Sequence, residues 1–256
     1  MGTFYNGANC DIYIGKGAGK KLLDDISNAK KSVKIVSPYL SPFLIKQLIY
    51  LHKKGTNIQL VTTDNIEDFY GHYEKNINQL IQQHQIKDLG SEIVRNKWIE
   101  LVKILDYVNI AFVFTIFLLA YFSKEIKFLY GLIPIIVLIV IRKYFQRKIN
   151  NKQIYSYRYS QLFPFKVFVS PEISNRNNNT FIHSKIYIID DEIVYMGSLN
   201  FTSSGTKENY ETRIRTTDNN AVFKIIEEFN NLFYDSGHQE KNIKLWGREI
   251  YDEPIN

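Results

Sequence analysis

Two apolar runs, separated by only five residues, constrain the folding of this chain more than any other feature. Residues 107–122 (YVNIAFVFTIFLLAYF) and 128–141 (FLYGLIPIIVLIVI) contain no charged side chain. Segments this apolar on every side of a helix need a membrane or a large core around them. Each run is shorter than the ~20 residues that usually cross a bilayer, so the pair predicts two thin spans or a re-entrant hairpin. The alternative is a helical hairpin buried in a soluble core.

Basic residues on both sides of the runs indicate how this hairpin is oriented. The turn between the runs holds only Lys124 and Lys127. The positive-inside rule therefore places both flanks, and the rest of the chain, in the cytoplasm. The first fifteen residues show no basic region followed by an apolar stretch, so we expect no signal peptide and a multi-pass membrane protein. The flanking basic residues are Lys87, Arg95, Lys97 and Lys103 before the runs, and Arg142, Lys143, Arg147, Lys148, Lys152 and Arg158 after them.

Outside the hairpin, the periodicity of apolar residues alternates between strand and helix. This alternation indicates an α/β fold with a mixed, layered sheet. We expect three parts: a first part of the domain at 1–85, the inserted hairpin with its basic flanks at 86–160, and the remainder of the domain at 161–256. Strands are expected at 11–14, 32–37, 58–62, 165–169, 185–190, 193–196 and 211–215, and helices at 19–29, 41–54, 66–85 and 219–234.

The segment 181–202 (FIHSKIYIIDDEIVYMGSLNFT) carries the residues most suited to chemistry. His183 and Lys185 are two positions apart, so on a strand they project from the same face. An imidazole can attack phosphorus while a neighbouring ammonium holds the non-bridging oxygens. Gly197 and Ser198 follow a second short apolar run, where small residues allow a ligand to approach the backbone. The pattern therefore favours a phosphate-binding site.

At these residues the chain resembles the phospholipase D superfamily, whose signature is H-x-K-x4-D-x6-G-S-x-N. Every position of the signature is present at the family's spacing, from His183 through Lys185, Asp190 and Gly197 to Asn200. The resemblance extends over about 11–63 and 165–233. It implies a phospholipase D-like mixed sheet flanked by helices, interrupted here by the inserted transmembrane hairpin.

The resemblance also implies a role for each residue. His183 would be the nucleophile that forms a covalent phosphohistidine, and Lys185 and Asn200 would bind phosphate oxygens. Ser198 would line the pocket, and Asp190 would be an orienting or structural carboxylate, counted with the catalytic group. Glu211 lies where the family often places an Asn-x-Glu whose carboxylate holds a catalytic histidine. We therefore expect His183, Lys185, Asp190 and Glu211 to be catalytic, with no cofactor and no metal.

The chain departs from the larger members of the superfamily in one respect. Those enzymes use two copies of the motif, whereas no second H-x-K occurs here. Similarity to the small single-motif members implies a homodimer in which His183 of both chains meets at a two-fold axis. The five histidines show no tight metal-ligand spacing, and lysine with imidazolium supplies the positive charge that a metal would otherwise provide.

Three functions remain open at this point. The apolar hairpin favours a membrane-bound phosphodiesterase that hydrolyses a phospholipid. The net charge of +6 and pI near 9.1 favour an anionic partner, so a membrane-tethered endonuclease that cuts DNA or RNA is the alternative. A non-catalytic membrane scaffold is the third. The partners expected are therefore a second copy of the chain, a lipid bilayer, and a phospholipid or nucleic acid substrate.

Three further motifs carry less weight. Residues 15–21 (GKGAGKK) do not fit the phosphate-binding G-x4-G-K-[ST] loop and predict a turn between a strand and a helix. Residues 155–159 (YSYRY) indicate either an interfacial stretch beside the membrane or an aromatic platform for bases. Residues 175–179 predict a polar loop near the motif.

Overall fold

The computed structural model describes residues 3–64, 77–124, 126–170, 181–235 and 237–256. The chain forms two compact units. The sheet unit consists of residues 1–82 and 159–250, and the helical unit of residues 83–158 and 251–256. The predicted polar loop at 175–179 lies outside the described residues.

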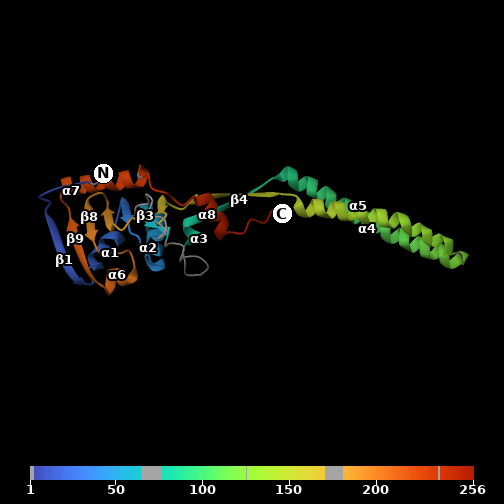
Figure 1. Cartoon of the computed structure of the whole chain (residues 1–256), viewed down its shortest axis with the longest axis horizontal. Coiled ribbons are helices and arrows are strands. Elements are labelled where there is room, and N and C mark those ends of the chain that lie inside the picture. The colour runs from blue at the N-terminus through green and yellow to red at the C-terminus, as the bar shows by residue number, and fades with distance from the viewer. Residues whose placement is uncertain (1–2, 65–76, 125, 171–180, 236) are drawn as a thin grey trace. The chain divides into compact units, whose positions relative to one another are not determined.

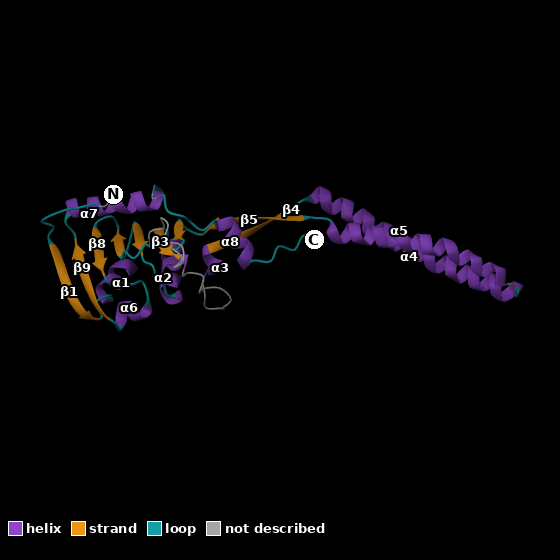
Figure 2. Ribbon diagram, in the orientation of Figure 1, coloured by secondary structure: helices purple, strands orange, loops and turns teal. Residues whose placement is uncertain are grey.

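The sheet unit is built on a seven-stranded sheet in the order β1-β9-β8-β7-β2-β3-β6. The pairs β2–β3 and β3–β6 are parallel, and the other four pairs are antiparallel, so the sheet is mixed. Figure 2 shows these strands side by side. The strands are β1 (Cys10–Lys16), β2 (Ser32–Val36), β3 (Asn57–Thr63), β6 (Phe165–Phe168), β7 (Ile186–Ile189), β8 (Ile193–Gly197) and β9 (Tyr210–Thr216).

Helices cover both faces of this sheet (Figures 1 and 2). On one face lie α1 (Lys20–Ser27), α2 (Pro42–Lys53) and the short α6 (Ser203–Lys207). On the other lies α7 (Asn219–Tyr234), whose Phe229 packs with Ile188 and Val194 in one apolar cluster. The carboxylate of Asp218 caps α7 by accepting hydrogen bonds from the backbone N–H of Asn220 and Ala221. The unit also contains α3 (Ile77–Leu80) and α8 (Ile243–Ile250). The predicted mixed α/β sheet flanked by helices is therefore confirmed.

One predicted element is wrong. We expected a helix over 66–85, of which 66–76 lies outside the described residues. The described part is a single helical turn, α3, followed by strand β4 (Ile81–Lys87). β4 pairs with β5 (Tyr155–Gln161), where the Gln85 amide donates to the Tyr157 hydroxyl at 3.2 Å. Because the partner strand is about 70 residues away in sequence, the polar pattern of 81–85 gives no local sign of it.

The helical unit consists mainly of two long antiparallel helices (Figure 1). Helix α4 (Leu89–Ser123) is capped by Asp88, whose carboxylate accepts a hydrogen bond from Ser91 N, and it ends at Lys124 in a left-handed conformation. Helix α5 (Ile133–Asn151) follows a 3-10 segment, η2 (Ile126–Leu132). Arg142 of α5 donates to the carboxylate of Asp106 of α4, which ties the two helices together.

The second apolar run therefore does not form one helix. Residues 128–132 belong to η2, and α5 begins at Ile133 with Pro134 in its first turn. Proline lacks an N–H and disfavours helical backbone at the residue before it, so a helix more readily begins at this position than continues through it. Among the described residues, only α4 is long and apolar enough to cross a membrane. A transmembrane hairpin of two spans thus remains a prediction.

Candidate active site

His183 and Lys185 lie together just before the start of β7. The Lys185 ammonium is 3.2 Å from both ring nitrogens of His183 and donates to the His183 backbone oxygen at 2.8 Å. His183 is exposed, whereas Lys185 is only 6% exposed. The pair therefore presents an accessible imidazole with a fixed positive charge beside it, the combination needed to attack a phosphate and hold its oxygens.

Burial of Lys185 changes its protonation. Removal from water lowers the pKa of the Lys185 ammonium, and the negative charge of Glu211 opposes this effect without cancelling it. A poorly hydrated ammonium interacts more strongly with an incoming anion than one in bulk water, because less water must be displaced and screening is weaker. The site is thus electrostatically suited to an anionic group.

Glu211, the second residue of β9, is 8% exposed and bound to its neighbours. Its carboxylate accepts hydrogen bonds from the Ser198 hydroxyl and from the Asn209 amide, the latter at 3.2 Å. The Ser198 oxygen in turn accepts from Thr212 N at 3.0 Å. The structure therefore brings Glu211 and Ser198 together, and the Asn209 of the predicted Asn-x-Glu pattern holds the carboxylate from the other side.

Gly197 is needed because two strands approach closely at the end of β8. Its φ of +152° is rare for residues with a side chain. A Cβ at this position would lie 2.0 Å from the backbone oxygen of Thr212. The next residue, Ser198, donates its N–H to that same oxygen at 3.1 Å. The glycine thus allows the turn of residues 198–202 to begin where it does.

Asn200 lies within this turn, and its side-chain oxygen is buried without a hydrogen-bond partner. Most buried polar side-chain atoms in proteins are paired, so this amide oxygen is an exception. The backbone on either side is held in place: the Tyr187 hydroxyl donates to Leu199 O at 2.6 Å, and Phe201 N donates to the Ser37 hydroxyl at 2.9 Å. The motif includes neither Ser37 nor Tyr187. In the sequence they are marked only by their positions, Ser37 at the end of a predicted strand and Tyr187 on the same strand face as Lys185.

Asp190 lies apart from these residues, at the opposite end of β7 from His183. Its carboxylate accepts backbone hydrogen bonds from Lys30, from Lys31 at 2.6 Å and from Ser32 at 2.9 Å. Burial alone would raise the pKa of Asp190, but these N–H donors outweigh it and lower the pKa. Of the two roles expected for Asp190, orienting or structural, its contacts fit the structural one, and it does not join the His183–Lys185 pair.

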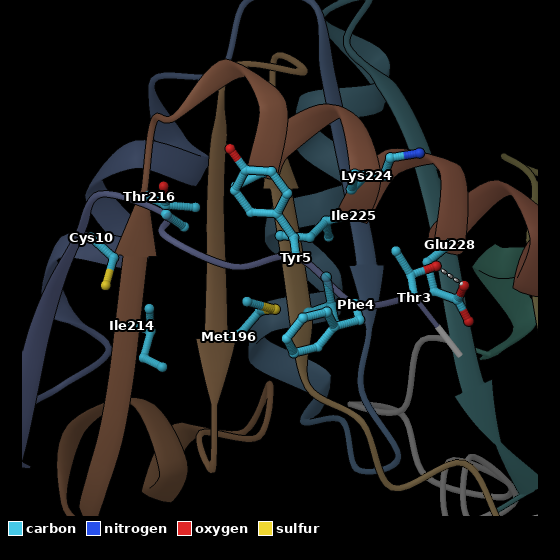
Figure 3. A pocket seen from close by; sticks show the side chains of 13 residues that line it. Thr3, Phe4, Tyr5, Cys10, Met196, Ile214, Thr216, Lys224, Ile225 and Glu228 are labelled. Atoms are coloured by element: carbon cyan, nitrogen blue, oxygen red, sulfur yellow. Dashed lines mark hydrogen bonds between the residues drawn. The ribbon is translucent and has the colours of Figure 1, made fainter. Parts of the chain in front are cut away.

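An apolar cavity of about 450 Å³ lies elsewhere, on the α7 side of the sheet (Figure 3). Ile186, Met196 and Ile214 line it from the strands, and the segment containing Phe4 passes across it. Because side chains alternate along a strand, Ile186 points away from the face that carries Lys185. This cavity is therefore separate from the candidate active site. Among the described residues, no three His, Cys, Asp or Glu side chains gather in a metal-binding group.

A histidine and a lysine at a strand end, followed by a Gly-Ser-x-Asn turn, form the arrangement that the resemblance to the phospholipase D superfamily predicts. A family model described as "Cardiolipin synthase, PLD-like domain" matches residues 22–108 and 134–233. The match covers well over half of the chain, so the protein belongs to this family of phospholipase D-like domains. A comparison with curated proteins gives no match.

Several solved structures are similar to the chain at low identity. NucT from Helicobacter pylori is 14% identical with a TM-score of 0.46, over 92% of this chain and 100% of that one. Nuc from Salmonella typhimurium, described as a phospholipase D family member, is 12% identical with a TM-score of 0.41, over 91% and 99%. A phosphatidylserine synthase from Haemophilus influenzae is 13% identical with a TM-score of 0.43, over 98% and 44%. These values are too low to transfer a substrate.

Proposed function

We propose that the protein is a membrane-anchored phosphodiesterase that works through a covalent phosphohistidine, without a metal ion, as a homodimer. The position of the Lys185 ammonium, 3.2 Å from both ring nitrogens of an exposed His183, is the observation that carries the proposal. Membership of the phospholipase D-like family supports the same reaction class. The catalytic unit faces the cytoplasm in this proposal, as the basic flanks of the apolar runs indicate.

The reaction takes two steps. In the first, a ring nitrogen of His183 attacks phosphorus, the bond from phosphorus to the leaving oxygen breaks, and a general acid protonates that oxygen. In the second, water attacks the phosphohistidine and gives a proton to the group that acted as general acid, the P–N bond breaks, and the phosphomonoester leaves as His183 is restored. Lys185 and Asn200 hold the non-bridging oxygens throughout, where negative charge is greatest in each transition state.

Three further residues position this machinery. Glu211 sets the orientation of a catalytic histidine through its charge, and Ser198 shapes the pocket while bonded to that carboxylate. A carboxylate that accepts a hydrogen bond from one ring nitrogen of a catalytic histidine commonly fixes the tautomer of that histidine. Asp190 does not belong to the His183–Lys185 pair. Its carboxylate accepts backbone hydrogen bonds that connect the start of β2 to the end of β7.

A second copy of the chain would supply the general acid. The chain has one motif, so the second histidine must come from His183 of another copy.

Two substrate classes fit the site. Helix α4 favours a phospholipid, because an anchor of mean hydropathy 1.9 over 18 residues would keep the protein at a bilayer. The description of the matched family, which names cardiolipin synthase, points the same way. Nucleic acid is the second candidate, and the net charge of +6 favours it.

A paired turnover assay on the detergent-purified full chain tests the proposal. One arm offers phospholipid vesicles and the other single-stranded DNA and RNA, both with EDTA. We expect turnover in one arm that is lost in His183→Ala and kept in His52→Ala, whose histidine contacts Phe163 instead of Lys185. Turnover that survives in His183→Ala contradicts the proposed nucleophile. Silence in both arms from a folded dimer favours the non-catalytic scaffold.

A further inference from the structure

Two exposed aromatic side chains stand close to the turn that carries Asn200. Tyr39 is 42% exposed and lies between β2 and α2, and Phe43 is 60% exposed in the first turn of α2. The apolar core of the sheet unit thus leaves both rings accessible. Neither residue belongs to the phosphate-binding motif.

Backbone hydrogen bonds hold this aromatic segment beside the catalytic turn. Ser41 N donates to Phe201 O at 3.0 Å, and Leu40 and Phe201 form a parallel bridge. Phe201 directly follows Asn200, and Leu40 directly follows Tyr39. A ligand whose phosphate is held by Asn200 therefore lies next to the segment that carries the two rings.

Positive charge accompanies the rings. The Lys207 ammonium lies 5.4 Å from the centre of the Phe43 ring, within the range of a cation–π contact. Lys207 also lines a cavity of about 330 Å³ between α1 and α6, together with Lys20 and one acid, Asp24. The Lys207 ammonium therefore covers part of the Phe43 ring, and the exposed remainder is accessible to a planar group. Lys207 and Lys20 are placed to bind the phosphates of a nucleic acid backbone.

Polar side chains lie on the two segments beside Phe43, 41–43 and 203–207. The hydroxyls of Ser41 and Ser203 lie 3.4 Å apart, and Ser204 is exposed. A surface that inserts into lipid needs a continuous apolar area, usually the whole face of an amphipathic element. Separate rings among hydroxyl and ammonium groups are instead typical of grooves that bind single-stranded nucleic acid, where bases stack and lysines follow the backbone.

We infer that Phe43, together with Tyr39 and Lys207, forms a base-stacking subsite for single-stranded nucleic acid next to the catalytic pocket. This inference rests on the proposed phosphodiesterase function and names the substrate class of that site. A base stacks on Phe43, flanking phosphates lie near Lys207 and Lys20, and the scissile diester reaches His183. A single strand is required because the faces of bases in a duplex are already covered.

Binding of a labelled oligonucleotide tests the inference. The full chain carries His183→Ala so that the probe is not cleaved, and fluorescence anisotropy gives the Kd for oligothymidylate and for an abasic oligonucleotide of equal length. Phe43→Ala should raise the Kd for oligothymidylate about ten-fold, the size expected for the loss of one stacked base, and leave the abasic Kd within about two-fold. Phe43→Trp should keep the affinity.

A matched control is available on α7. Phe223 is 59% exposed and has the Lys224 ammonium 5.7 Å from its ring, yet it lies on the helix that covers the other face of the sheet. Phe223→Ala should leave both Kd values unchanged. This control separates stacking at the subsite from a general loss of surface aromatics.

Several results overturn the inference. Equal weakening of both oligonucleotides by Phe43→Ala, or no weakening, removes the stacking role. Loss of binding to anionic vesicles with unchanged oligonucleotide binding assigns the ring to a membrane instead, and a change in sedimentation assigns it to contact between copies. The proposed reaction is tested separately with 4-nitrophenyl methyl phosphate, which carries no base. If this diester is cleaved in a His183-dependent manner while the oligonucleotide results are negative, only the subsite fails; if it is not cleaved, the proposed function fails.

Discussion

The sheet unit and the helical unit differ in how far their apolar side chains are buried. In the sheet unit many of the large ones, including Trp246, Tyr187 and Phe201, are almost fully buried, although a few such as Phe43 and Phe223 are exposed. Helix α4 has 35 residues, of which only Val102 and Ile116 are buried. In its most apolar stretch of 18 residues, 6% of the residues are buried. Apolar residues in the first unit are explained by the core that they build. The exposed apolar side chains of α4 need an apolar environment outside the chain, and we propose that this environment is a lipid bilayer.

The candidate chemistry shows the same division. Every residue of the proposed active site, from His183 to Glu211, belongs to the sheet unit. If α4 is only an anchor, then damage to one unit should leave the activity of the other intact.

The largest effect is expected from His183→Ala. Loss of a nucleophile should lower turnover by about a thousand-fold or more, because a covalent step has no substitute in the same pocket. Since the side chain is exposed, the melting temperature and the fraction of protein in the membrane should stay unchanged. Steady-state turnover, thermal unfolding and membrane flotation measure the three properties. A variant that loses turnover and membrane binding together contradicts the separation of the units.

The next effect is expected from a charge in the middle of α4. Phe114→Lys places an ammonium at an exposed position of the apolar run, at a cost of roughly 2.5–3.5 kcal/mol for insertion. We expect release from membranes in flotation and unchanged turnover of a soluble diester. Ile93→Lys, at a similarly exposed position outside the apolar run, is the control and should stay at the membrane. Release of both variants, or of neither, counts against α4 as the anchor.

A smaller effect is expected from Asp190→Asn, on stability. The carboxylate accepts several backbone N–H bonds, and losing its charge should lower the free energy of unfolding by about 2 kcal/mol. Because the pKa of Asp190 is lowered in the folded protein, its contribution is present above the ordinary carboxyl value and is lost as the pH falls through the folded pKa. Urea unfolding at pH 7 and at acid pH measures the difference.

The neighbouring Asp191→Asn is the control for this prediction. Asp191 is half-exposed and forms a single ion pair with Lys34, a kind of contact that contributes about 0–1 kcal/mol. We expect its variant to unfold almost like the native chain. If the two variants were equally stable at pH 7, the structural role of Asp190 would be wrong.

The smallest effect is expected in the pH profile of the reaction. Burial lowers the pKa of Lys185, so kcat/KM should fall as the pH rises through a value below the ordinary 10.5 of lysine. In the same window the unfolded chain binds the proton more tightly than the folded one, so stability should rise with pH as the active charge is lost. Lys185→Arg, which keeps its charge, should remove this alkaline limb. A native rate that stays level up to pH 10.5 contradicts the assignment.

The sequence predicted those parts of the fold that depend on neighbouring residues. The alternation in 185–196 predicts β7 and β8, and the spacing of His183, Lys185 and Gly197 predicts the residues that lie together at the strand ends. It could not predict β4, whose partner strand is distant, or the interruption of the second apolar run at Pro134, where local proline chemistry outweighs hydropathy. Nor could the motif spacing show that Asp190 lies at the far end of β7, because a signature records order and not contact.

The most direct test of the account is to trap the covalent intermediate. The full chain is mixed with excess 4-nitrophenyl methyl phosphate and quenched in alkali, which preserves phosphohistidine, and its peptides are analysed by mass spectrometry. The account predicts a methylphosphoryl group on the peptide that contains His183, absent from His183→Ala and independent of EDTA. A modified residue elsewhere, or full turnover by His183→Ala, would contradict it.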